Sequence, residues 1–181
     1  MFDFFRKIQT LPAAEKLPVV LRVPPRAEED LVTGLSIKVG ALIDAPLCPK
    51  GLVLMCGEIG RQSRDVQSWA DRMGAVLMVV EEENLSIEWI RNYAPGIDFM
   101  LVDADYMADT EDTIDFCMRV RRATPSLPII LLSSDVRSHD FTCERMMACD
   151  ATLKAPLLQM ALTMGVQAAY QNNEYFVKTR G

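Results

Sequence analysis

Residues 96–107 read Gly-Ile-Asp-Phe-Met-Leu-Val-Asp-Ala-Asp-Tyr-Met, and the rest of the 181-residue chain is interpreted from this stretch. Its apolar run, residues 97–102, is broken by a single acid and lies between the turn signal Ala-Pro-Gly and a polar segment. Such a run is typical of a strand covered on both faces in a parallel sheet. Asp103 and Asp105 follow at the carboxyl end of that strand, where open α/β sheets bind their ligands. A loop aspartate that caps a helix starting near Asp109 is the alternative that this stretch leaves open.

Strands and helices alternate along the chain around this stretch. Apolar runs of strand length lie at residues 52–56, 76–80, 129–132 and 151–153. Segments with helical character lie at residues 61–73, 85–93, 110–123 and 140–147, and a last helix begins at Pro156. Five strand–helix units predict a parallel sheet with helices on both faces, joined by right-handed crossovers. We therefore expect an α/β domain of three layers, built on a doubly wound five-stranded parallel sheet.

Residues 1–49 differ from the rest of the chain, because they hold six of its ten prolines and show little helical periodicity. A short amphipathic helix is predicted at residues 1–9, which either packs on its own domain or docks on a membrane or partner. Short strands are predicted at residues 17–23 and 35–42. The expected organisation is an N-terminal extension over residues 1–49, the α/β domain over residues 50–173 and a C-terminal tail over residues 174–181.

The composition argues against several classes of protein. The net charge of −6 disfavours a nucleic-acid-binding surface, and the basic cluster Arg119, Arg121 and Arg122 fits the last turn of a helix better. No apolar run approaches the roughly 20 residues that cross a bilayer, and the first residues do not form a secretory signal. Five cysteines without a Cys-x-x-Cys pair indicate free thiols, buried at Cys56 and Cys117. We expect a cytoplasmic protein with no nucleic-acid partner and no membrane span.

Four predicted strands end in residues with usable chemistry. These residues are Glu58, Asp103, Ser133 and Lys154. Because the carboxyl ends of parallel strands emerge at one edge of a sheet, the four side chains can converge there. Each also has a purely structural interpretation, as an acid at a helix N-terminus, a strand-end hydroxyl bonded to backbone, or a solvated loop lysine. Those interpretations do not explain why all four residues follow strands.

Three motifs carry a resemblance to a known family. They are Asp98-x4-Asp103-x-Asp105, Leu127-Pro-Ile-Ile-Leu-Leu-Ser133-Ser134 and Asp150-Ala-Thr-Leu-Lys154-Ala-Pro156. In this order and at these spacings, they resemble the receiver domain of response regulators, the phosphoacceptor module of two-component signalling. The resemblance runs from Leu52 to about Asn172 and implies the flavodoxin-like receiver fold.

The resemblance also implies roles for the strand-end residues. Asp103 would accept a phosphoryl group from a sensor histidine kinase or a phosphotransfer protein. Mg²⁺ would neutralise part of the incoming charge, bound by Glu58, Asp103 and the backbone carbonyl of Asp105. Lys154 would contact a phosphoryl oxygen, and the Ser133 hydroxyl would swing toward the phosphoryl group. A downstream protein would then read the resulting shift between two conformations.

The chain departs from the family's pattern in several places. Its first strand ends in Cys-Gly-Glu, residues 56–58, with one carboxylate where receivers have two adjacent acids. The loss is expected to weaken Mg²⁺ binding, and the acidic run at residues 81–83 either compensates or is a solvated face. The other departures are Ala151 at the aromatic switch position, Met107 at a frequent proline position, and Lys154-Ala155-Pro156 in place of a Lys-Pro step.

Two functions follow from the resemblance. The first is a stand-alone atypical receiver, not an enzyme, that is phosphorylated on Asp103 and acts through protein–protein binding. The second is a phosphorylation-independent adaptor that keeps only the scaffold. A small α/β enzyme or nucleotide-binding domain lacks support, because the chain has no glycine-rich phosphate loop and no Gly-x-Ser-x-Gly elbow. The single histidine, His139, is predicted to be a loop residue that is solvent-exposed or capping.

Methionines near the predicted fourth and fifth helices leave the oligomeric state open. Met146, Met147, Met160 and Met164 cluster there in the sequence. Their flexible side chains suit an adaptable interface for a homodimer, and they equally suit filling of the core.

Overall fold

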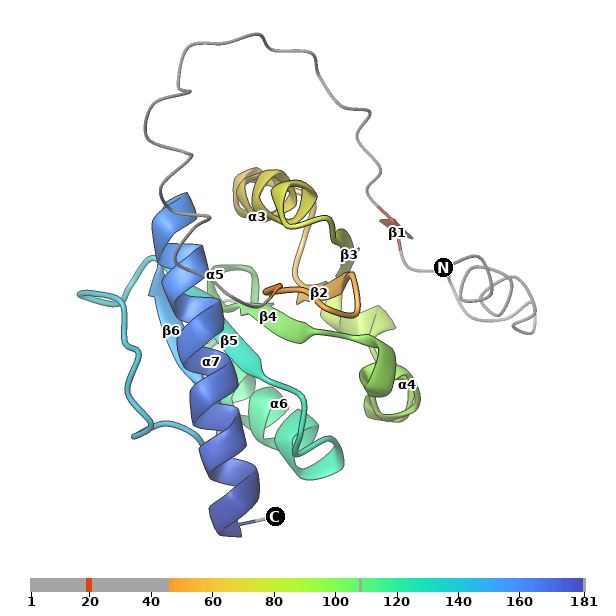
Figure 1. Cartoon of the computed structure of the whole chain (residues 1–181), viewed down its shortest axis with the longest axis vertical. Helices are drawn as coiled ribbons and strands as arrows, with labels where there is room; N and C mark the ends of the chain where they lie inside the picture. The colour runs from red at the N-terminus through yellow and green to blue at the C-terminus, as the bar shows by residue number, and fades with distance from the viewer. Residues whose placement is uncertain (1–18, 21–45, 108, 181) are drawn as a thin grey trace, which may run out of the picture.

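The computed structural model describes residues 19–20, 46–107 and 109–180 (Figure 1). The helix predicted at residues 1–9 and the strand predicted at residues 35–42 lie outside the described residues. Of the strand predicted at residues 17–23, the structure describes β1 (Val19–Val20). None of the described helices has the length and apolar character needed to cross a membrane.

A six-stranded sheet lies at the centre of the domain, in the order β1-β3-β2-β4-β5-β6. Five of these strands run parallel and in register: β2 (Leu52–Cys56), β3 (Val76–Val80), β4 (Phe99–Asp103), β5 (Ile129–Ser133) and β6 (Ala151–Lys154). The two-residue β1 pairs antiparallel with β3 at one edge. The predicted five-stranded parallel sheet is confirmed, with β4 between β2 and β5.

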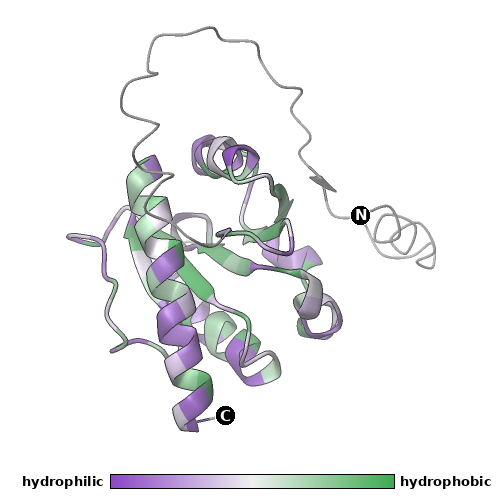
Figure 2. Cartoon of the chain, viewed as in Figure 1, coloured by the Kyte–Doolittle hydropathy of each residue, from purple (hydrophilic) through white to green (hydrophobic). Residues whose placement is uncertain are grey.

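Helices cover both faces of the sheet, as predicted. They are α3 (Arg61–Arg72), α4 (Ile87–Tyr93), α5 (Ala104–Met107), α6 (Thr110–Ala123) and α7 (Gln159–Arg180), with 3₁₀ turns η2 (Glu82–Asn84) and η3 (Ala94–Gly96). Trp69 of α3 and Leu162 of α7 belong to one core cluster, whereas Ile90 of α4 and Phe116 of α6 belong to the other. The strands are accordingly apolar on both faces, as their colour in Figure 2 shows.

The last helix differs slightly from its prediction. It begins at Gln159, three residues after Pro156, and it continues through Arg180. Residues 174–180, expected to be part of a tail, therefore form the end of α7. The Ala155–Pro156 peptide bond that precedes the helix is cis.

The helix predicted at residues 140–147 is wrong. The backbone of Asp140 instead bridges to Thr152 of β6, with an N–H···O distance of 2.8 Å in each direction. The Asp140 side chain accepts hydrogen bonds from the Thr142 N–H and hydroxyl, so its local bonds favour a turn. A short helix leaves the N–H and C=O groups at its ends without hydrogen-bond partners. Pairing with the edge strand β6 gives the backbone of Asp140 such partners. Residues 144–148 form turns.

Buried aspartates precede β4 and β6 and bind the backbone of the neighbouring strand. Asp98 accepts hydrogen bonds from the N–H groups of Lys50 and Leu52, at 2.9 and 3.1 Å. Asp150 accepts one from the N–H of Ile129, at 2.7 Å. These carboxylates fix the amino ends of adjacent strands, because each bond joins segments far apart in the sequence.

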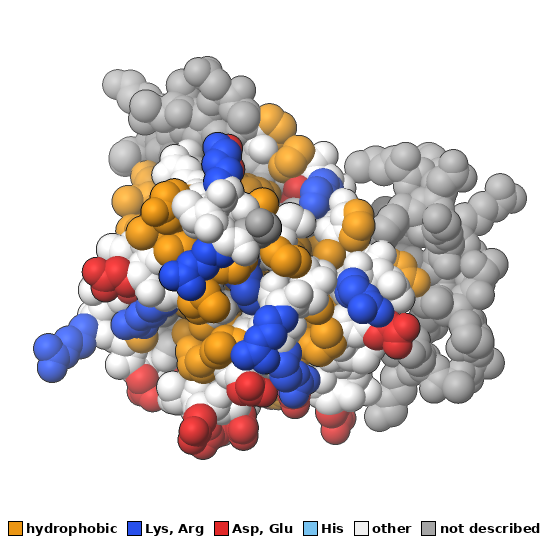
Figure 3. Space-filling model, turned by 90° about the horizontal axis from the view of Figure 1, so that it is seen from below, with side chains coloured by type: hydrophobic (Ala, Val, Ile, Leu, Met, Phe, Trp, Pro, Cys, Tyr) orange, Lys and Arg blue, Asp and Glu red, His pale blue; other side chains and the backbone are white. Residues whose placement is uncertain are grey.

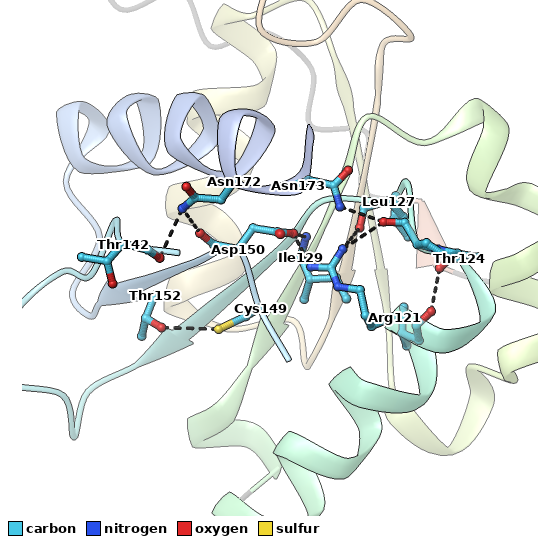
Figure 4. A network of polar contacts seen from close by, with 12 residues as sticks. Arg121, Thr124, Leu127, Ile129, Thr142, Cys149, Asp150, Thr152, Asn172 and Asn173 are labelled. Carbon is cyan, nitrogen blue, oxygen red and sulfur yellow. Dashed lines mark hydrogen bonds and ion pairs between the residues drawn. The ribbon is translucent and has the colours of Figure 1, made fainter. Parts of the chain in front are cut away.

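Asp150 also belongs to a buried polar network between α6, α7 and the sheet (Figure 4). Its Oδ2 pairs with Nη2 of Arg121 at 2.5 Å, and both side chains are almost fully buried. Nη1 of Arg121 donates to the carbonyls of Pro125 and Leu127, and its guanidinium lies 4.8 Å from the ring centroid of Phe176. One member of the basic cluster therefore holds the fold together and is not on the surface.

The cysteines of the described residues are free thiols, as predicted. Cys56 and Cys117 are buried in the core. Burial raises the pKa of Cys56 to about 12, so this thiol stays protonated and packs as a small apolar side chain.

Candidate functional site

A cavity of about 240 Å³ lies at the carboxyl edge of the sheet, where the loop after β2 meets the loop after β4. Its lining residues are Glu58, Gly60, Arg61, Gln62, Asp103, Asp105 and Tyr106. Three residues predicted from the sequence, Glu58, Asp103 and Asp105, thus surround one space. The loops bring them together because β2 and β4 are parallel neighbours.

Asp103 ends the central strand β4, and its side chain is 5% exposed. Its Oδ1 accepts hydrogen bonds from the backbone N–H groups of Asp105 at 3.1 Å and Tyr106 at 3.3 Å. This arrangement holds the carboxylate in one orientation at the start of the short helix α5. Its Oδ2 receives no hydrogen bond from any residue that the structure describes. Asp103 therefore has one oxygen, Oδ1, that is fixed by hydrogen bonds, and one oxygen, Oδ2, that is free to react.

The electrostatics of the cavity are unfavourable to a bare carboxylate. Burial raises the pKa of Asp103, and the negative charges of Asp105 and Glu58 raise it further. The two backbone N–H groups on Oδ1 act in the opposite direction. A cation in the cavity would relieve the mutual repulsion of the carboxylates and lower this pKa.

The raised pKa predicts that Asp103→Asn stabilises the protein at neutral pH. A carboxyl with a raised pKa favours folding below its ordinary pKa, and that advantage is lost as pH rises through the folded-state value. Asn carries no charge and keeps the oxygen that caps α5. Without divalent cations, urea unfolding should give a higher midpoint for Asp103→Asn at pH 7, with a smaller difference near pH 4. A lower midpoint at pH 7 would contradict this prediction.

The Asp105 side chain joins three segments around the cavity. Its carboxylate accepts hydrogen bonds from the backbone N–H of Ser134, at 2.9 and 3.1 Å for the two oxygens. Gln62 donates its Nε2 to the same carboxylate at 3.0 Å. The side chain therefore connects the loop after β4 to α3 and to the end of β5.

Ser133 and Lys154 do not line this cavity. Nζ of Lys154 donates to the carbonyl of Arg137 at 3.2 Å, and its backbone N–H donates to Nδ1 of His139 at 3.0 Å. The Ser133 hydroxyl oxygen accepts a hydrogen bond from the N–H of Asp135 at 3.1 Å. Over residues 46–107 and 109–180, no ion pair joins Lys154 to an acid. Their predicted roles in phosphate binding stay predictions.

The fold is similar to that of several solved structures. A response regulator receiver domain protein from Clostridium thermocellum superposes with a TM-score of 0.53, over 69% of this chain and 98% of that chain, at 12% sequence identity. This chain has the receiver fold. The chemotaxis response regulator CheY4 of Vibrio cholerae superposes with a TM-score of 0.50, over 66% of this chain and 98% of that chain, at 14% identity. No protein-family model and no curated protein sequence matches the chain.

The backbone lies close to Asp103 at Gly57, where this chain lacks one acid of the usual receiver pair. A Cβ atom at this position would lie 3.0 Å from Cβ of Asp103 and 3.6 Å from its Oδ2. Real Cβ atoms rarely approach another atom so closely. A side chain at position 57 would therefore require Asp103 to shift by a few tenths of an ångström.

Restoring the second acid by Gly57→Asp is expected to destabilise the protein by about 1–3 kcal/mol, because it overpacks the space beside Asp103. Urea unfolding measures this cost. Gly60→Ala is the matched control in the same loop, since its Cβ would lie 3.7 Å from the Glu58 side chain. An unchanged stability for Gly57→Asp, or equal losses for the two variants, would refute the packing argument.

Sequence reasoning missed Arg61, Gln62 and Tyr106 as cavity residues. Arg61 and Gln62 open α3, directly after the loop that carries Glu58. Their distance of three and four residues from Glu58 is a usable signal, because the first turn after a strand in the receiver fold faces the same edge as the strand's end. Tyr106 follows Asp103 by three residues, within α5.

The oxygen atoms around the cavity are of the kind that bind a hard cation. Carboxylate and carbonyl oxygens are the ligands that Mg²⁺ prefers. The described part of the chain nevertheless holds no cluster of three His, Cys, Asp or Glu side chains arranged to bind a metal by themselves. A cation here would thus depend on two carboxylates, a backbone carbonyl, and water or ligand oxygens.

A second cavity, of about 260 Å³, lies between the carboxyl-terminal ends of α6 and α7. Its lining is Met118, Arg121, Arg122, Pro125, Met147, Phe176 and Arg180. Figure 3 views the molecule from this end and shows Lys and Arg side chains beside hydrophobic ones. Since the lining contains no carboxylate or other nucleophile, the cavity at Asp103 is the better candidate for chemistry.

Proposed function

We propose that this chain is an atypical receiver that accepts a phosphoryl group on Asp103 and acts through protein–protein binding. One observation carries the proposal: Asp103 ends the central strand of a receiver fold with Oδ2 open, beside a cavity shared with Glu58 and Asp105. The donor would be a sensor histidine kinase or a phosphotransfer protein, and a downstream protein would read the phosphorylated state.

The geometry around Asp103 supports nucleophilic attack by Oδ2. The two N–H groups on Oδ1 hold the carboxylate in place, so it needs little reorientation before attack. Oδ2 forms a bond to phosphorus while the bond from phosphorus to the donor breaks, and the electron pair leaves with the donor. Mg²⁺, when bound by Glu58, Asp103 and the carbonyl of Asp105, would neutralise charge at the phosphoryl group.

Exposed methionines support a protein-binding output. Met147, Met160 and Met164 are between 45% and 50% exposed, so they do not fill the core. Flexible apolar side chains on a surface suit contacts with another protein. A homodimer and a separate target protein both remain predictions for these side chains, as does the cytoplasmic location.

The alternative function is a phosphorylation-independent adaptor. Two observations favour it: the ammonium of Lys154 donates to the carbonyl of Arg137, and the second acid of the pair is absent at Gly57. An adaptor needs only the scaffold and its surface, so neither feature would impair it.

Treatment of the purified full chain with acetyl phosphate and Mg²⁺ distinguishes the two functions. Under the proposal, intact-mass spectrometry and a phosphate-affinity gel show one phosphoryl group, and beryllofluoride binds in the presence of Mg²⁺. Calorimetry measures the binding of beryllofluoride. If neither phosphoryl transfer nor beryllofluoride binding occurs, the phosphoacceptor function is wrong and the adaptor function is favoured.

A further inference from the structure

We propose that Arg61, the first residue of α3, provides the cation that stabilises the phosphoryl group on Asp103, in place of Lys154. This inference rests on the proposed function and concerns the same cavity. In it, the positive charge comes from the loop after β2, on the opposite side of β4 from the strand that carries Lys154.

The described contacts leave Lys154 engaged elsewhere and Arg61 available. Lys154 lies at the end of the edge strand β6, two strands from Asp103, and its Nζ binds the carbonyl of Arg137. Arg61 lines the cavity together with Asp103 and is exposed. Across the described residues, its side chain forms neither a hydrogen bond nor an ion pair. Its guanidinium can therefore turn toward a new anion without breaking an existing bond.

The open oxygen of Asp103 lies on the side of the loop after β2, which leads into Arg61. Oδ1 is held by the N–H groups of Asp105 and Tyr106, on the α5 side. Oδ2 lies beside Gly57, only four residues before Arg61. A phosphoryl group on Oδ2 would consequently form next to the loop that leads into α3.

The start of α3 is suited to an added dianion. Arg61 can donate two parallel hydrogen bonds to phosphoryl oxygens, which a lysine ammonium cannot do in the same geometry. The 12-residue helix α3 has Gly60 as its N-cap and no acid in its first turn, and the Glu58 carboxylate is the acid that lies near Gly60. Gly60, Arg61 and Gln62 all line the cavity, which places this end of the helix at the site.

The phosphorylation of Asp103 by acetyl phosphate needs no other reactant. Oδ2 of Asp103 forms the new P–O bond, the bond between phosphorus and the acetate oxygen breaks, and acetate leaves with the electron pair. The products are acetate and an acyl phosphate on Asp103, whose phosphoryl oxygens carry the charge that Arg61 would face.

The test compares Arg61→Gln, Arg61→Lys and Lys154→Met in the full chain, with Arg64→Gln as the control on the same helix. Arg64 is exposed like Arg61 but does not line the cavity. The first two measurements are the initial rate of phosphorylation by acetyl phosphate with Mg²⁺ and the Kd for beryllofluoride. A third, the Kd for Mg²⁺ alone, separates loss of the phosphoryl contact from damage to the cation site.

We expect Arg61→Gln to lower the initial rate of phosphorylation and the affinity for beryllofluoride by about 10- to 100-fold. Loss of one charge-assisted hydrogen bond has an effect of this size. Mg²⁺ binding is not weakened, Arg61→Lys recovers part of the loss, and Lys154→Met and Arg64→Gln stay within about threefold of the parent. Normal phosphorylation of Arg61→Gln together with its loss in Lys154→Met would overturn the inference and leave the proposed function intact. A parent chain that takes neither phosphoryl group nor beryllofluoride would overturn both.

Discussion

Replacing Asp103 with Asn is expected to abolish phosphorylation of this chain by acetyl phosphate. The amide oxygen of Asn is neutral and a poor nucleophile, whereas its shape and its hydrogen bonds from Asp105 and Tyr106 are retained. The fold should therefore persist while the transfer of phosphate is lost. Intact-mass spectrometry after incubation with Mg²⁺ and acetyl phosphate measures the result.

Asp109→Asn is the matched control for this experiment. Asp109 is an exposed aspartate that caps α6, with Oδ1 accepting from the N–H groups of Glu111 and Asp112. Asn is an equally good N-cap, so this variant should be phosphorylated like the parent. Phosphate that remains on Asp103→Asn would show that another residue is the acceptor and would remove the basis of the proposed function.

Replacing Asp150 with Ala is expected to cost about 3–5 kcal/mol of stability, because it leaves the buried guanidinium of Arg121 without its counter-charge. The substitution also removes the acceptor for the N–H of Ile129 at the start of β5. Burial raises the pKa of Asp150, and Arg121 opposes that rise. Urea unfolding followed by circular dichroism measures the loss.

A double-mutant cycle separates this ion pair from simple cavity formation. Arg121→Ala with Asp150→Ala should cost less than the sum of the single losses, since neither charge is then buried alone. Arg119→Ala is the control on the same helix: its partner Asp115 is 3.9 Å away, and both side chains are about half exposed or more. Its effect should stay within about 1 kcal/mol. Additive losses at residues 121 and 150 would contradict a coupled pair.

The local pattern of residues was sufficient to predict those helices and strands whose formation depends on residues close together in the sequence. The run before Asp103 is apolar on both faces, so it predicts a buried parallel strand, and the spacing within residues 110–123 predicts α6 with its correct ends. Asp103 at a strand end also identified the cavity, because strand direction alone fixes which edge of a parallel sheet the carboxyl ends share.

The helix predicted at residues 140–147 shows where local pattern was insufficient. Asp140, its first residue, pairs instead with Thr152 of β6, more than ten positions later in the chain. The same limit applies to Arg121: its place in a helix was predictable, but its burial depends on Asp150 and Phe176, which come from other elements.

The amino-acid sequence predicted the alternation of strands and helices, the doubly wound parallel sheet and the position of Asp103 at the carboxyl end of a strand. These predictions follow from the period of apolar residues within each segment and from the order of the segments along the chain. Three features became visible in the folded structure: Arg61 shares the cavity of Asp103, Lys154 binds Arg137, and a side chain at Gly57 would crowd Asp103. Those outcomes depend on distances between segments far apart in the chain, and packing in three dimensions sets these distances.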